Sequence, residues 1–87
     1  MIWILTNIMI LLSSPDKIPK IMSTAIYDNR ADCEQSLDNL LESFQSIKNS
    51  EADVFLGFEL DKDNQRVLIM KNKIQASFFK CTLPDNY

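Results

Sequence analysis

Two cysteines, Cys33 and Cys81, are the residues of this chain whose side chains could most readily do chemistry. A cysteine near the start of a helix is the better nucleophile, because the helix N-terminus lowers the pKa of the thiol. The chain has no histidine and no CxxC pair, so neither cysteine has a general base or a resolving thiol near it in sequence. Three roles therefore stay open: a disulfide, two buried thiols acting as small apolar side chains, and a reactive site.

A disulfide would matter for both stability and location. Cys33 falls on the apolar side of an expected helix and Cys81 near the end of an expected strand, so the two meet if that strand lies under the helix. The bridge would close a loop of about 49 residues and stabilise the fold by about 4 kcal/mol through the reduced entropy of the unfolded chain. Because disulfides persist in oxidising compartments, we expect a periplasmic, secreted or membrane-associated protein rather than a cytoplasmic one.

Other chemistry is not supported by the residue pattern. Asp61 and Asp63 have the alternation of a calcium loop, but Arg66 stands where that loop needs glycine and Asn72 where it needs a bidentate glutamate. Gly57 is the only glycine and cannot by itself form a phosphate-binding loop. We therefore predict no catalytic residue, no metal ligand and no cofactor, and a protein that is not an enzyme.

Charge is unevenly distributed along the chain. Residues 28–53 carry seven acids against two bases, and residues 62–80 carry five bases against one acid. A basic, aromatic sheet face for single-stranded nucleic acid would use the following side chains: Arg66, Lys71, Lys73, Phe78, Phe79 and Lys80. The net charge of −3 argues against nucleic acid as the main partner, and lysines commonly protect sheet edges. A cytosolic regulator that binds nucleic acid or phosphate through the three lysines is kept as an alternative.

The clearest element is an amphipathic helix within residues 28–49. Apolar side chains recur at the spacing of a single helical face, at Cys33, Leu37, Leu40, Leu41, Phe44 and Ile47. Asp28 or Asn29 can cap its first turn, because either side chain accepts hydrogen bonds from free amides there. The helix therefore begins just before Cys33 and has one apolar face to bury.

Strand patterns flank this helix on both sides. They cover residues 1–12, 20–27, 54–60, 66–71 and 74–83, with polar turns between them. The order β-β-α-β-β-β predicts a single α+β domain over residues 1–87. In it, an antiparallel sheet of four to five strands carries one helix packed on one face.

Both faces of this sheet should be apolar. In the second strand, regular alternation places Ile21 with Ser23 on one side, and Thr24 with Ile26 on the other. Later strands also carry large apolar side chains on both sides, whereas one helix covers one face only. We therefore expect a non-enzymatic interaction or structural module whose second sheet face contacts a protein, a second copy of the chain or a membrane surface.

Residues 1–12 allow a second interpretation. They are strongly apolar and could be an export signal or a membrane anchor in a secreted or tethered protein. A signal should open with a basic residue, and none occurs before Lys17. A helix of this length spans roughly 18 Å, short of a hydrocarbon core of about 30 Å. The strand interpretation is therefore preferred.

The chain resembles a loose group of small, uncharacterised two-cysteine proteins from bacterial genomes, often marine, and from phage genomes. The resemblance lies in the opening "IWIL" (2–5), in the strand-to-helix junction "AIYDNRADCEQSL" (25–37), and in "FFKC" (78–81) with its late cysteine. In that group the helix cysteine and the C-terminal cysteine look paired. The resemblance thus implies a Cys33–Cys81 bridge and implies no activity.

Overall fold

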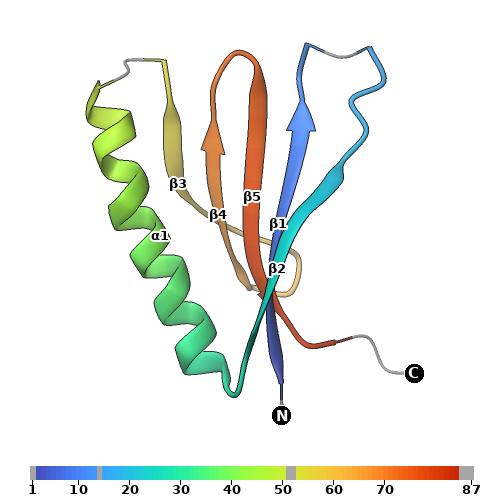
Figure 1. Ribbon diagram of the computed structural model, residues 1–87, viewed down its shortest axis with the longest axis vertical. Coiled ribbons are helices and arrows are strands. Elements are labelled where there is room, and N and C mark those ends of the chain that lie inside the picture. The colour runs from blue at the N-terminus through green and yellow to red at the C-terminus, as the bar shows by residue number, and fades with distance from the viewer. Residues whose placement is uncertain (1, 14, 51–52, 85–87) are drawn as a thin grey trace.

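One antiparallel sheet of five strands, in the order β2-β1-β5-β4-β3, carries a single helix across one face (Figure 1). The computed structural model describes residues 2–13, 15–50 and 53–84. The elements are β1 (Trp3–Leu11), β2 (Lys20–Tyr27), α1 (Arg30–Ser50), β3 (Phe55–Leu60), β4 (Arg66–Lys71) and β5 (Gln75–Thr82). The predicted α+β class and the predicted element order are confirmed.

The apolar N-terminal segment forms a strand with a neighbour on each side. β1 pairs with β2 and, from the other end of the sequence, with β5, which is the middle strand of the sheet. Leu5 is buried under the helix, whereas Ile4 and Ile8 lie on the opposite face. Within the described ranges no helix is both long and apolar enough to cross a bilayer.

The helix begins at a cap that the sequence narrowed to two candidates. Asn29 is the residue used: its Oδ1 accepts a hydrogen bond from the backbone amide of Asp32 at 2.8 Å. The Asp32 carboxylate lies in the first turn and Lys48 in the last, and both charges are favourable for the helix dipole.

The core lies between α1 and the face of the sheet that it covers. Its buried members are Leu5, Cys33, Leu37, Leu56, Leu68, Phe79 and Cys81. The Phe44 ring of the helix packs on Phe79 with ring centres 5.4 Å apart. Ile47, expected on the same buried stripe, is 40% exposed. The helix of 21 residues is about 30 Å long and a strand of six about 20 Å, so its last turns extend beyond the core.

A β-bulge in β2 overturns the expected alternation of that strand. Asn7 pairs with Ser23, but the next residue of β1, Ile8, pairs with Ile21, so β2 contains one extra residue at this point. Directly paired residues point to the same side of a sheet. Ile21 therefore lies on the face of Ile8, away from the helix, whereas regular alternation had placed it with Ser23.

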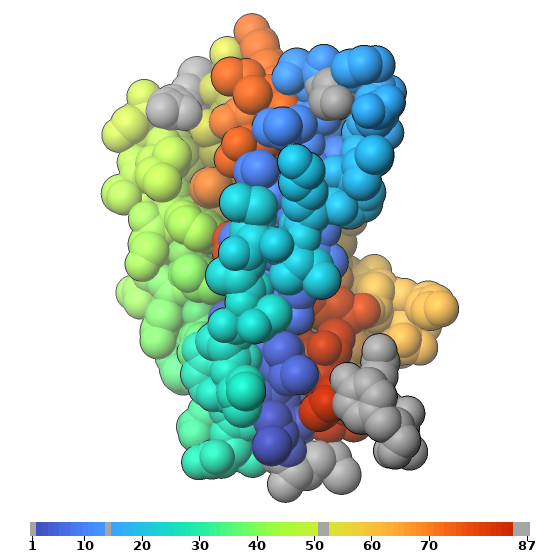
Figure 2. All heavy atoms as spheres, turned by 45° about the vertical axis from the view of Figure 1, so that its right-hand side comes forward, coloured from blue at the N-terminus to red at the C-terminus, as the bar shows by residue number. Residues whose placement is uncertain are grey.

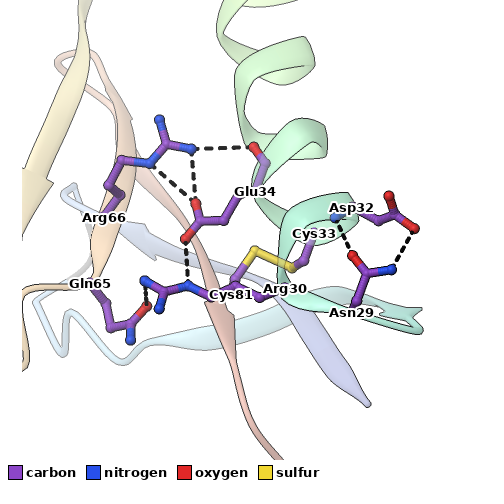
Figure 3. Close-up of a disulfide and its surroundings, with 8 residues drawn as sticks. All are labelled: Asn29, Arg30, Asp32, Cys33, Glu34, Gln65, Arg66 and Cys81. Carbon is purple, nitrogen blue, oxygen red and sulfur yellow. Dashed lines mark hydrogen bonds and ion pairs between the residues drawn. A yellow bond between two sulfur atoms is a disulfide. The ribbon is translucent and has the colours of Figure 1, made fainter. Parts of the chain in front are cut away.

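The helix is held to its face of the sheet by a covalent bond. Cys33 in its first turn forms a disulfide with Cys81 of β5, with Cα atoms 6.1 Å apart (Figure 3). Both residues are fully buried. The bridge thus joins the start of the helix to the middle strand, and no free cysteine remains in the chain.

A group of charges beside the disulfide adds a second link between helix and sheet. Arg66 of β4 donates to Glu34 of α1 at 2.8 Å (Figure 3). It also donates to Asp38 of α1 at 2.9 Å, and its guanidinium lies 4.5 Å from the centre of the Phe58 ring. Hydrogen bonding to Asp38, and then to Glu34, raises the pKa of Arg66 above its ordinary value. Arg30 pairs with Glu34 at 3.6 Å and lies over the Trp3 ring.

The disulfide makes unfolding sensitive to reductant. We expect complete reduction of Cys33–Cys81 to lower the free energy of unfolding by about 4 kcal/mol, because the unfolded chain gains the entropy of a long open loop. Urea denaturation with and without reductant measures this difference.

The matched control is the double variant Cys33→Ala/Cys81→Ala, whose urea midpoint should not respond to reductant. A wild-type midpoint that stays constant after both thiols are shown to be free would contradict the stabilising role of the bridge.

Candidate interaction surface

The face of the sheet opposite α1 is the candidate site, and it is called the open face below. No helix or strand lies over it in the part of the chain that the structure describes. Side chains that pair across neighbouring strands form rows on this face. Two of these rows differ in chemistry and define the surface.

The first row is apolar from one edge of the sheet to the other, and we name it the apolar row. In the order β3, β4, β5, β1 and β2 its members are Gly57, Ile69, Phe78, Ile8 and Ile21. Its end on β2 exists because the bulge turns Ile21 to this side. Its aliphatic and aromatic side chains stand on four strands, with Gly57 on the fifth, and such a row is typical of a sheet face that packs against another layer.

The second row lies nearer the chain ends and is polar. In the same strand order its members are Glu59, Val67, Lys80, Thr6 and Thr24. The open face therefore has an apolar band bordered on one side by hydroxyl and charged groups.

The open face is hollowed on the side of β3, β4 and β5. A groove of about 750 Å³ is lined by Phe55, Ile69, Ala76 and Phe78, among others. Ile69 is 8% exposed and Ala76 3%, so the floor is shielded by its neighbours although no element covers it. In profile, Figure 2 shows this side of the molecule hollowed between the β1–β2 loop and the β3–β4 turn.

The β2 side of the open face projects instead. Ile21 and Ile26 are each 69% exposed, which is high for large aliphatic side chains. Figure 2 shows β2 lying on the outside of the molecule with the helix to one side. The open face thus has a hollow toward one edge and protruding isoleucines at the other.

The lysine of the polar row, Lys80, is neutralised within the chain. Asp61, which follows β3, contacts the Lys80 ammonium, and its Oδ1 accepts from the backbone amides of Asp63 at 2.8 Å and Gln65 at 2.9 Å. The Lys80 hydrogen bond, followed by the one from Gln65, lowers the pKa of Asp61 to about 2. In the acidic turn considered as a calcium loop, the Asp61 carboxylate thus binds two backbone amides of the turn and the Lys80 ammonium.

The basic and aromatic residues considered for nucleic acid do not form one surface. Arg66 lies on the helix side, bound to Glu34 and Asp38, and Lys73 lies 3.5 Å from Asp53 beyond the strands. Lys71 and Lys80 do lie on the open face, two rows apart. Phe78 faces the groove and Phe79 the helix core.

Sequence reasoning found the open face but missed three of its residues. Regular alternation placed Ile21 on the wrong side. Gly57 was considered only for phosphate binding, although a glycine inside a strand can mark the close approach of another group. The structure leaves space there, since a Cβ at Gly57 would meet only the Phe55 ring, at 3.5 Å. Asp61 was considered for calcium, and its pairing with Lys80 depends on a fold contact that no local pattern encodes.

Comparison of the chain with protein-family models, with curated proteins and with solved structures gives no match. The function proposed below therefore rests on the surface itself.

The Asp61–Lys80 pair predicts an acid-sensitive step in stability. The Asp61 carboxyl has a folded-state pKa of about 2 against an ordinary value of 3.8, so the unfolded chain binds the proton more readily. Its stabilisation is present above the ordinary value and is lost as the pH falls from about 4 to about 2. We expect Asp61→Asn to be less stable than the wild type near neutral pH and equal to it near pH 2, by urea denaturation across this range.

Asp63→Asn is the control, since it removes a carboxylate from the same turn without touching Lys80. Because Asp61 and Lys80 are intact in this variant, it should retain the loss of stability that the wild type shows as the pH falls. Parallel curves for Asp61→Asn and the wild type would refute the role of the pair.

Proposed function

We propose that this protein is a non-enzymatic interaction module of an oxidising compartment, and that the open face of its sheet is the surface that binds another protein chain. One observation carries the proposal: the apolar row places large apolar side chains on four of the five strands, on the face that no described element covers. The fold therefore presents a ready interface without any rearrangement.

The exposure of this face is energetically unfavourable for an isolated chain. Full burial of one isoleucine or phenylalanine side chain stabilises by about 1.5–3 kcal/mol relative to leaving it in water. Ile21, Ile26 and Phe55 are each about half exposed or more on the open face. Contiguous apolar patches of this kind are typical of protein or membrane contact sites. Association that covers the face recovers this free energy.

The charges and thiols of the chain support a binding role over catalysis. Lys80 is paired with Asp61, and Arg66 with Glu34 and Asp38. Both cysteines are consumed in a buried disulfide, so neither offers a nucleophile. A histidine, the commonest general base, does not occur in the sequence.

The disulfide also supports the proposal of an oxidising compartment. A buried bridge that joins helix to middle strand contributes to the fold, and such structural bridges persist outside the reducing cytosol. We therefore place the module in the periplasm, outside the cell or at a membrane surface.

Site-specific photo-crosslinking tests the proposal. The photoreactive residue benzoylphenylalanine replaces Ile21 or Ile26 on the open face, or Leu60 as a control, in protein produced in its native host. Leu60 is 65% exposed but pairs with Arg66 on the helix side of the sheet, so it matches the other two in exposure and differs in face. Mass spectrometry identifies the adducts.

We expect protein adducts from both open-face positions and none from Leu60. An absence of adducts, or the same adducts from all three positions, would contradict the proposal. Adducts with lipid alone would indicate that the open face binds a membrane surface and not a protein.

A further inference from the structure

We propose that the partner of the open face is a second copy of this chain, packed face to face about a two-fold axis that runs along β5. This inference rests on the proposed function, because it names the occupant of the same surface. The result would be a two-layer β-sandwich with one helix on each outer side.

The apolar row is ordered so that it complements itself. Phe78 lies on β5, the middle strand, with Ile69 and Ile8 on either side of it and Gly57 and Ile21 at the ends. A two-fold axis along β5 sets each half of the row against the other half of its copy. Ile69 then faces Ile8, and the protruding Ile21 faces the side-chain-free position at Gly57.

The shape of the open face also fits a two-fold axis along β5, because its groove and its protruding side chains lie on opposite sides of that strand. The groove lies on the β3–β5 side and the exposed isoleucines of β2 at the opposite edge. The proposed axis brings the β2 edge of one copy over the groove of the other, and does so twice. In such an interface a residue i of one copy contacts a residue j of the other copy, and residue j of the first contacts residue i of the second. A closed two-fold dimer requires this reciprocity. Aligned sheets cross at about 30°, so the match is closest near β5.

The area is sufficient only if nearly the whole face is used. Five strands spaced about 4.8 Å apart, with about six paired residues each at about 3.4 Å, give a flat area of roughly 500 Å² before side-chain relief is added. A standard interface buries about 600–1,000 Å² on each partner. The dimer therefore needs both the groove and the β2 edge, and loss of either should weaken it.

The charges of the open face permit self-association. Across the proposed axis Glu59 faces Thr24 and Lys71 faces Ile10, so neither meets a like charge. Lys80 has its own carboxylate partner in Asp61. Lys80 lies on β5, so the proposed axis brings two copies of it near each other. The Asp61 partner of each neutralises the ammonium there, which removes the like-charge repulsion that would otherwise separate the copies.

Pairing through the sheet edge is less favourable than pairing through the face. β2 is the longer edge strand, but its bulge interrupts the regular ladder and Lys20 lies at its start. Bulges and edge lysines are two of the common means by which proteins prevent edge-to-edge pairing. The apolar row of the open face contains no lysine, and the bulge adds Ile21 to it.

Sedimentation velocity over a wide concentration range tests the dimer, with the full oxidised chain. We expect a monomer–dimer equilibrium in the wild type. Ile21→Glu places two charges in each interface and should raise the dimer dissociation constant at least about tenfold. Leu60→Glu, which adds the same charge at an equally exposed position on the other face, should leave it unchanged.

Gly57→Val separates association from folding. The added side chain stands beside the Phe55 ring, at the position that the proposed axis sets opposite Ile21. A β-branched residue also suits a strand better than glycine does. We expect the urea midpoint of the dilute, monomeric variant to be unchanged or higher than that of the wild type, and its dimer to be weaker. A folding defect would give the opposite change in midpoint.

Two results would overturn the inference. One is a wild-type chain that remains monomeric at its highest soluble concentration. The other is a dimer that Ile21→Glu and Gly57→Val leave intact, or that Leu60→Glu weakens equally. Crosslinks from Ile21 and Ile26 to a different protein would then still support the proposed function, so the two failures are distinguishable.

Discussion

A five-stranded sheet with apolar side chains on both faces has to bury two surfaces, and this chain has one helix to do it. The helix satisfies the face formed by residues such as Leu5, Leu68 and Phe79. The opposite face keeps Ile21 and Ile26 in solvent. The proposed binding role follows from this imbalance between the apolar area of the sheet and the cover that the chain itself supplies.

The links on the helix side keep this imbalance fixed. The Cys33–Cys81 bridge ties the first turn of α1 to β5, and Arg66 ties the next turn to β4. A small domain has a thin stability margin, so a helix held only by its apolar stripe could shift or detach. Anchored in this way, the helix holds the sheet in one shape, and the open face is presented as a preorganised surface. Preorganisation lowers the entropy lost on association.

Much of the fold is predictable because it depends on local periodicity. The helix, the five strands and the two apolar faces follow from spacing alone. The strand order does not, because β1 and β5 pair across almost the whole chain, and no local pattern selects that partner. The pairing of Cys33 with Cys81 was open from the residues for the same reason, since it requires β5 to lie under the helix.

The candidate site was predictable in kind but not in detail. The bulge in β2 changes the side of Ile21, and a sequence read at strict period two cannot detect a one-residue insertion in pairing. Gly57 did carry a signal, because glycine is unfavourable inside a strand and its presence suggests that another group comes close.

The solvent accessibility of isoleucine methyl groups tests most directly whether the open face is covered in the associated protein. NMR relaxation enhancement by a soluble paramagnetic agent measures it residue by residue in the oxidised protein at high concentration. In the single chain, Ile21 and Ile26 on the open face are about as exposed as Ile18 and Ile74, which lie in loops. If the open face is covered, Ile21 and Ile26 are strongly protected while Ile18 and Ile74 stay accessible. Equal enhancement at all four methyl groups would contradict it.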